Sequence, residues 1–113
     1  MTPTALAQAQ LDAYNARDLD RFVACYSDTV QVYRMPEAKL PAISGKAPFS
    51  AFYASERFNR PALRAELLKR IVLGNKVFDH ERITGVRQDA FEMVVVYEVV
   101  DGLIQTMWSF SPA

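Results

Sequence analysis

The sequence predicts an α+β fold in which helices come first and a mostly antiparallel sheet follows. Apolar residues recur every three or four positions over residues 2–26 and again over 48–60, which is the period of a helix. From residue 63 onward the apolar residues are β-branched or alternate, and two short turn signals divide this part into hairpins. The predicted order is α-α-β-(β)-α-β-β-β-β, in a single domain that spans residues 1–113.

The first two helices are predicted from their start signals. Thr2-Pro3 is typical of an N-cap followed by proline at the first helical position, and this helix extends to about Asn15. Asp18 is a second N-cap. The second helix carries its apolar residues on one face and is predicted to end at Ser27-Asp28.

A strand is predicted over residues 29–35, where the apolar period changes to two. Val30 and Val32 share one face of this strand, and Arg34 continues the same face. Residues 42–44 fit a short edge strand.

The third helix is predicted to begin at Pro48 and to stop before Arg60-Pro61. The remaining chain is predicted to form two hairpins, because Gly74-Asn75 and Asp101-Gly102 are two-residue turn signals. The four strands are expected over residues 63–73, 76–84, 91–100 and 103–110.

Counting outward from a two-residue turn predicts which residues pair. In the second hairpin, Val95 then faces Trp108 and Tyr97 faces Thr106. This face is nearly all large and apolar, so we expect it to line the core. The opposite face is too apolar for contact with solvent alone. Its apolar residues are Val94, Val96 and Met107.

In the first hairpin, Phe78 shares one face with His80 and Arg82. We expect this face to be the inner one because it carries more bulk. The other face pairs Arg70 with Asp79 as a cross-strand ion pair. A single bulge would reverse the assignment of the two faces.

Four segments carry a family pattern: residues 14–20, residues 22–33, residues 44–46 before a helix with Phe52 and Tyr53, and residues 97–104. With these segments the chain resembles the nuclear-transport-factor-2-like superfamily, which includes SnoaL-like and ketosteroid-isomerase-like proteins. The resemblance implies a cystatin-like cone, in which a strongly curved sheet wraps around three helices and a ligand pocket. It also implies homodimerisation through the outer face of the sheet. The superfamily contains isomerases, cyclases, dehydratases, epoxide hydrolases and non-enzymes, so the resemblance does not select an activity.

In ketosteroid isomerases an aspartate base works with a tyrosine and a protonated aspartate. The resemblance places the base position on Arg34, or on Tyr33 with a one-residue gap. It places the tyrosine near Gln10 and the second aspartate near Val95. None of the three groups stands at its position, so we expect no steroid isomerisation by that mechanism.

Two residues are predicted to be catalytic, His80 and Arg34. His80 is expected on the inner face as a general acid or base; a simpler interpretation is a half-buried histidine bonded to a neighbour. Arg34 is expected to bind a carboxylate or an enolate, or else to reach solvent beside Glu37. If the inner face is the opposite one, the acid–base candidates become Asp79 and Glu81.

The pocket is expected to be apolar with several cationic groups, and so to prefer an anionic or carbonyl-bearing ligand. The residues expected to bind this ligand are Tyr26, Phe52, Tyr53, Phe78, Arg82, Tyr97 and Trp108.

Composition argues against several classes of protein. Thirteen basic and thirteen acidic residues cancel, whereas nucleic-acid binders carry a basic excess. The chain has neither an apolar run of membrane-spanning length nor a signal-like N-terminus, so no membrane partner is expected. One histidine, one cysteine and no nucleotide-binding glycine motif predict no metal and no cofactor. Cys25 cannot form an internal disulfide, which fits a cytoplasmic location.

Two functions of different classes fit these features. The first is a cofactor-free proton-transfer isomerase, or a related lyase or hydrolase, acting on an apolar carbonyl or carboxylate substrate. The second is a non-catalytic ligand-binding or dimeric interaction module of the same fold. The expected partners are a small molecule and a second copy of the chain. The sequence does not identify the substrate.

Overall fold

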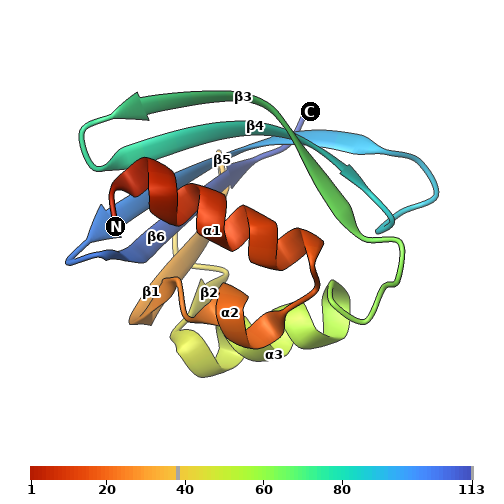
Figure 1. Cartoon of the computed structure of the whole chain (residues 1–113), viewed down its shortest axis with the longest axis horizontal. Helices are drawn as coiled ribbons and strands as arrows, with labels where there is room; N and C mark the ends of the chain where they lie inside the picture. The colour runs from red at the N-terminus through yellow and green to blue at the C-terminus, as the bar shows by residue number, and fades with distance from the viewer. Residues whose placement is uncertain (38, 113) are drawn as a thin grey trace.

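The structure of the chain is a computed structural model that describes residues 1–37 and 39–112. Within these residues the chain forms three helices and six strands, in the predicted order. The helices lie beneath a curved sheet, and the two layers enclose the core (Figure 1). The helices are α1 (Pro3–Asn15), α2 (Leu19–Val23) and α3 (Lys46–Glu56). The strands are β1 (Tyr26–Met35), β2 (Ile43–Ser44), β3 (Arg64–Leu73), β4 (Lys76–Thr84), β5 (Phe91–Val100) and β6 (Leu103–Phe110).

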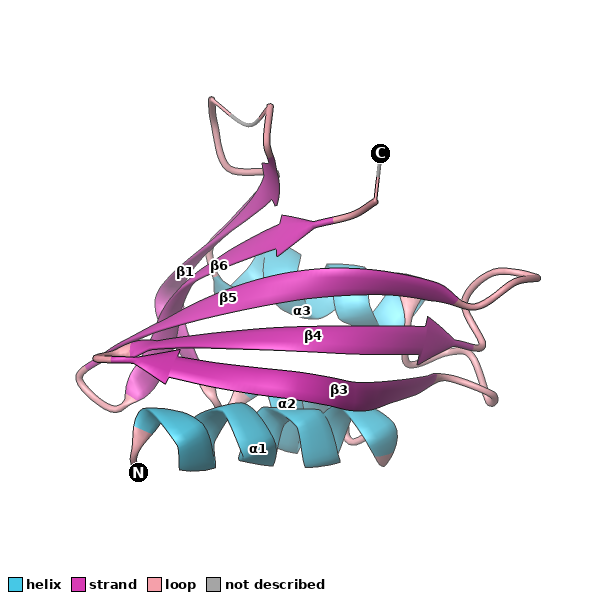
Figure 2. Ribbon diagram, turned by 90° about the horizontal axis from the view of Figure 1, so that it is seen from above, coloured by secondary structure: helices cyan, strands magenta, loops and turns pink. Residues whose placement is uncertain are grey.

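The strands are ordered β2-β1-β6-β5-β4-β3 across the sheet. β1 and β6 are parallel neighbours, and the other neighbours are antiparallel. The long strands β3, β4 and β5 lie side by side, with α1 running along the edge of this part of the sheet (Figure 2). The predicted α+β class and the mostly antiparallel sheet are therefore confirmed. None of the helices in the described residues has the length and apolar character needed to cross a membrane.

The predicted starts of the first two helices are confirmed by their hydrogen bonds, whereas α3 begins at Lys46, two residues before the predicted Pro48. The Ala5 N–H donates to Thr2 Oγ1 at 3.1 Å, and the Arg21 N–H donates to Asp18 Oδ1 at 3.2 Å. α2 ends earlier than predicted, because the Ile104 N–H donates to the Cys25 carbonyl at 2.9 Å and draws this segment into the sheet. β1 therefore begins three residues before the predicted strand.

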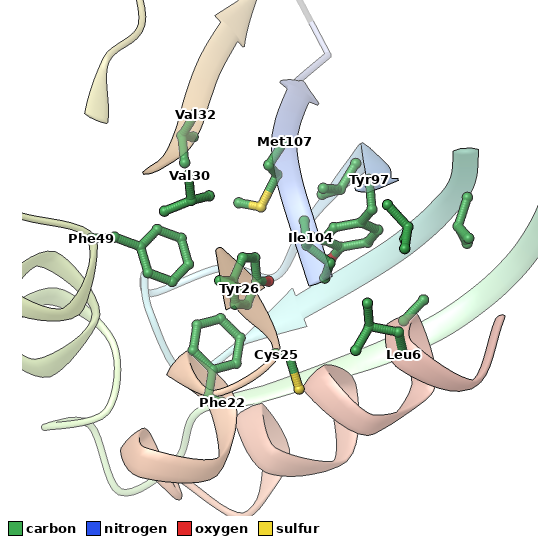
Figure 3. Close-up of a cluster of buried hydrophobic side chains, with 14 of the residues drawn as sticks. Leu6, Phe22, Cys25, Tyr26, Val30, Val32, Phe49, Tyr97, Ile104 and Met107 are labelled. Atoms are coloured by element: carbon green, nitrogen blue, oxygen red, sulfur yellow. The ribbon is translucent and has the colours of Figure 1, made fainter. Parts of the chain in front are cut away.

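The core is an aromatic cluster between the helices and the inner face of the sheet. Phe22, Tyr26 and Phe49 are almost fully buried, and the ring centres of Tyr26 and Phe49 are 4.4 Å apart. Figure 3 shows these three rings packed together, with Tyr97 and Met107 approaching from the strands. Burial of rings of this size supplies much of the stability of a small domain.

The predicted pairing of the second hairpin is wrong beyond its first pair. Val99 faces Ile104 as expected, but Gln105 is an extra residue in β6 that shifts the rest of the strand by one position. Such a bulge moves every following side chain to the other face. Met107 is consequently buried in the core, whereas Trp108 lies on the outer face and stacks on Tyr33 with ring centres 6.3 Å apart.

The predicted faces of the first hairpin are wrong, although the pairing near its turn is correct. Arg70 faces Asp79 and Ile71 faces Phe78, as counted. The buried face, however, is the one that carries Val77, Asp79, Glu81 and Ile83. Side-chain size predicted the wrong inner face, because Phe78 lies in a row of apolar side chains on the outer face. This row crosses five strands through Ile71, Phe78, Val96, Trp108 and Tyr33.

Candidate functional site

A cavity of about 70 Å³ lies between the helices and the inner face of the sheet. Most of its wall is aromatic or aliphatic, as is usual for small-molecule sites. Polar side chains reach it from helices, strands and the loop after α3. Those that matter for its chemistry are Gln10, Tyr14, Arg34, Arg57, Glu81 and Tyr97.

Glu81 places a carboxyl group in the wall of this cavity. Its residue is 5% exposed, and it points inward from the middle of β4. The pKa of Glu81 is raised to about 8: burial is the largest cause, the negative charge of Asp79 adds to it, and the positive charge of Arg70 opposes both. At neutral pH the carboxyl is therefore mostly protonated, and it can both donate a proton and, once ionised, act as a stronger base than an ordinary glutamate.

Asp79 is buried two residues before Glu81, but its surroundings differ. Arg70 donates from Nε to Asp79 Oδ1 at 2.7 Å and from Nη2 to Asp79 Oδ2 at 2.9 Å. Arg70 also donates from Nη1 to Gln8 Oε1 at 3.0 Å. These bonds direct the guanidinium toward Asp79. Among the residues that the structure describes, no cation lies within ion-pair distance of Glu81.

A chain of hydrogen bonds joins α1 to the strands at the cavity wall. The Tyr26 hydroxyl donates to Gln10 Oε1 at 3.0 Å, and Gln10 Nε2 donates to the Tyr97 hydroxyl at 3.1 Å. Burial raises the pKa of Tyr97 well above its usual value, and the charge of Glu81 adds to this effect. Tyr97 is therefore neutral. Its oxygen accepts from Gln10, so its own proton is oriented for use as a donor.

Two arginines meet at one aromatic ring in the cavity wall. The guanidinium carbons of Arg34 and Arg57 lie 5.3 Å and 5.2 Å from the centre of the Phe52 ring. Such cation–π contacts hold the planar group in place while its N–H edge stays available. The charges of Arg57 and Arg34 also reach Tyr53, where they partly oppose the rise in the pKa that burial causes.

Comparison with known proteins agrees with this architecture. A family model for the SnoaL-like domain matches residues 7–107 of the chain. The chain belongs to the SnoaL-like domain family. A search of curated proteins finds no match.

Solved structures share the fold of this SnoaL-like domain at low sequence identity. An uncharacterised cystatin-fold protein from Novosphingobium aromaticivorans is 22% identical, with a TM-score of 0.86 over 96% of this chain and 97% of that one. A Δ5-3-ketosteroid isomerase from a Mycobacterium species is 20% identical, with a TM-score of 0.81 over 99% and 95%. A computationally designed 17-OHP binder is 15% identical, with a TM-score of 0.82 over 100% and 94%. At these identities the likeness concerns the fold.

Five of the residues predicted for the site do lie at the cavity of this SnoaL-like domain. Arg34, Tyr26, Phe52, Tyr53 and Tyr97 line it. The positions that the resemblance assigned to the ketosteroid isomerase groups lie there as well, since Gln10 and Val95 are also part of the wall.

The other four predicted residues lie on the outer face of the sheet, so their expected inward placement is wrong. They are Phe78, His80, Arg82 and Trp108. Trp108 points outward because of the bulge at Gln105. The three β4 residues point outward because the inner face of this strand is the opposite of the predicted one. His80 Nε2 lies 2.6 Å from Glu92 Oε1, beside a hollow of about 560 Å³ on the outer face that is more open to solvent than the inner cavity.

A signal for the correct face was present in the sequence. Val77 and Ile83 are both β-branched, and they share a face with Asp79 and Glu81. Successive side chains of a strand point to opposite faces, so every second residue shares a face. If the apolar residues at both ends of the strand are buried, the residues between them on the same face point inward as well. Arg57 had no such signal, because it follows α3 and reaches the cavity only through the fold.

Among residues 1–37 and 39–112, no group of three or more histidine, cysteine or acidic side chains comes together as a possible metal site.

Proposed function

We propose that this SnoaL-like domain is an acid–base enzyme that moves a proton on a small carbonyl-bearing substrate, with Glu81 as the proton carrier. The observation that carries the proposal is the buried Glu81 carboxyl in the cavity wall, whose pKa is raised to about 8. A carboxyl that titrates near the working pH suits proton transfer in both directions.

The geometry supports a two-step transfer. Ionised Glu81 removes a proton from the carbon next to the carbonyl group, and the electron pair moves onto the carbonyl oxygen. The Tyr97 hydroxyl donates a hydrogen bond to that oxygen, held in place by the 3.1 Å bond from Gln10. Glu81 then returns the proton to another carbon, and the enolate collapses to the ketone. Arg70 supports these steps, because its positive charge opposes the effect of the Asp79 carboxylate on Glu81.

The test is the isomerisation of 3-cyclohexen-1-one to 2-cyclohexen-1-one, which needs one proton removed and one returned. We expect the wild type to accelerate it over buffer, and the rate to rise with pH up to about 8. Glu81→Gln should lose about 10²–10⁴-fold, and Tyr97→Phe about 10²–10³-fold. Glu92→Gln is the matched control, because Glu92 is an exposed carboxylate on the outer face. Full activity in Glu81→Gln, or none in the wild type, would contradict the proposal.

We expect no more than trace turnover on a 3-keto-Δ5 steroid. Arg34, Gln10 and Val95 stand where the resemblance puts the catalytic groups of ketosteroid isomerases. The cavity volume of about 70 Å³ is also far below the roughly 300–1,000 Å³ of sites for drug-sized ligands. Rapid conversion of such a steroid by purified protein would overturn both points.

The small cavity also favours a second candidate, a non-catalytic module that binds a small ligand. In that case the protonated Glu81 and the Tyr97 hydroxyl act only as hydrogen-bond donors. The module then binds a small ketone without exchanging its protons, and proton–deuterium exchange followed by NMR separates the two candidates.

We further propose that two copies associate through the outer face of the sheet. The apolar row that includes Ile71, Phe78 and Trp108 is continuous across five strands, and Ile71 is 56% exposed. Met107, once expected on this face, is buried in the core and is not part of the proposed interface. Sedimentation at about 50 µM, a concentration chosen from the usual affinity scale, should give a dimer. Ile71→Lys should give a monomer, and a monomeric wild type would contradict the proposal.

A further inference from the structure

Arg34 and Arg57 bring two positive charges to the wall of the cavity, where Arg34 is exposed and Arg57 is half-buried. Both line it, and both sit on the same ring, that of Phe52. In the part of the chain that the structure describes, neither guanidinium is paired with a carboxylate. Arg57 donates from Nη1 to its neighbouring Glu56 carbonyl at 2.9 Å and also bonds the Tyr14 side chain, and neither partner is a carboxylate.

Among the described residues, the carboxyl groups on the inner face of the sheet do not pair with these two arginines. Asp79 is occupied by two hydrogen bonds from Arg70. Glu81 lines the cavity but is mostly neutral at pH 7, because burial raises its pKa to about 8. An anion bound beside the Phe52 ring is therefore attracted by the positive charges of both arginines.

The contact of both guanidinium groups with the Phe52 ring also determines what kind of anion fits. A guanidinium stacked on a ring keeps its plane fixed and presents its N–H fork at the edge. This fork matches the two oxygens of a carboxylate, with parallel hydrogen bonds. The remaining cavity is small and apolar, so the body of the ligand is a short aliphatic chain or a single ring.

We propose that Arg34 and Arg57 form a carboxylate-binding subsite, so that the ligand of this cavity is a small carboxylic acid whose apolar body extends toward Glu81. This proposal rests on the proposed function for the orientation of the substrate in the cavity. A keto acid that is held by its carboxylate presents its carbonyl group to Glu81 and Tyr97. Binding of the acid does not itself require that any proton be transferred.

The experiment compares three ligands of one shape and different charge: benzoate, benzamide and benzylamine. Dissociation constants are measured by NMR titration at pH 7. We expect benzoate to bind at least about tenfold more tightly than benzamide, and benzylamine to bind weakest, because a hydrogen bond to a charged group is stronger than a neutral one. The preference for benzoate should decrease as salt is added.

Arg34→Gln and Arg57→Gln should each weaken benzoate about tenfold and leave benzamide unchanged. Arg87→Gln is the matched control: its guanidinium carbon also sits over a ring, 4.1 Å from the centre of Phe91, but it does not line the cavity. Equal binding of benzoate and benzamide, no binding of benzoate, or an equal loss in Arg87→Gln would overturn the subsite.

Glu81→Gln separates this proposal from the proposed function. We expect this variant to bind benzoate as the wild type does while it loses isomerisation of 3-cyclohexen-1-one. Benzoate binding that depends on both arginines, in a protein without isomerase activity, keeps the subsite and rejects the enzyme. Isomerase activity without any preference for benzoate rejects the subsite alone.

Discussion

The two faces of β4 carry charged groups at alternating positions, and the fold gives them very different surroundings. Toward the helices, Asp79 and Glu81 are buried, and Asp79 is bound by Arg70. Toward the outside, the His80 and Glu92 side chains also lie within 2.6 Å of each other, but they are 43% and 54% exposed. Contacts of similar length therefore join a buried pair, Arg70 and Asp79, on the inner face and a solvent-exposed pair, His80 and Glu92, on the outer face.

This difference shows that exposure, more than distance, decides what a charged group does. Water screens the outer pair and solvates either partner if the other is removed. The inner carboxylates have no such alternative, so each depends on its neighbours. Asp79 is paired with Arg70 and takes a structural role. Within the part of the chain that the structure describes, Glu81 has no cation at ion-pair distance, and it holds its proton up to about pH 8.

The largest expected effect comes from removing the inner cation. Arg70→Met leaves the fully buried Asp79 without a partner, and we expect a loss of about 3–5 kcal/mol in the free energy of unfolding, measured in urea. Replacing Asp79 by leucine in the same variant should recover part of this loss, because no buried charge then remains. A loss under about 1 kcal/mol in Arg70→Met would mean that Asp79 is effectively solvated.

Trp108 and Phe49 compare aromatic side chains on the two faces of the sheet. Phe49→Ala removes a fully buried ring and should cost about 3–5 kcal/mol. Trp108→Ala removes a half-buried indole that stacks on Tyr33, and we expect about 1–2 kcal/mol. Both are measured at a concentration at which sedimentation shows a monomer. Equal losses would indicate that Trp108 points inward.

The pH dependence of the free energy of unfolding tests the contribution of the buried Glu81. Its pKa is raised from the ordinary 4.5 to about 8 in the folded state, so between these values the unfolded chain releases a proton that the folded chain keeps. The free energy of unfolding should therefore fall as pH rises through this window, by up to about 1.4 kcal/mol per pH unit, and level off above about 8. Glu81→Gln should lack this decline. Parallel pH profiles for the two proteins would show that Glu81 titrates normally.

The smallest effect is expected for the outer pair. His80→Gln removes one partner of an exposed contact, and we expect a change within about 1 kcal/mol. Isomerisation of 3-cyclohexen-1-one should stay at the wild-type rate, since His80 does not line the cavity. A large loss of activity in His80→Gln would restore the role that the sequence first suggested for this residue.

Local signals predicted the elements of this fold well. The caps at Thr2 and Asp18 and the two hairpin turns act over a few residues, so neighbouring side chains are enough to specify them. At the second turn Asp101 and Gly102 both have positive φ, as a two-residue hairpin turn requires. Arg70 and Asp79 were paired correctly because the count from Gly74-Asn75 to that pair meets no bulge.

The candidate site was predicted less well, because faces depend on contacts made across the whole sheet. The size of its side chain predicted that Phe78 points inward, but the ring packs in the apolar row on the outer face. The bulge at Gln105 left no mark in the pattern of β6, and it exchanged Met107 with Trp108. Each error moved a set of candidates from one side of the sheet to the other.

The sequence by itself determined the order of helices and strands, the turns and the resemblance to the SnoaL-like domain that the family comparison bears out. These features follow from local periodicity and from residue types that suit one environment. Only the tertiary structure decided that Glu81 lies inside, with no cation at ion-pair distance in residues 1–37 and 39–112, and that Arg34 from β1 and Arg57 after α3 both lie over the Phe52 ring. The physical reason is that burial and charge pairing are properties of side chains brought together from distant segments.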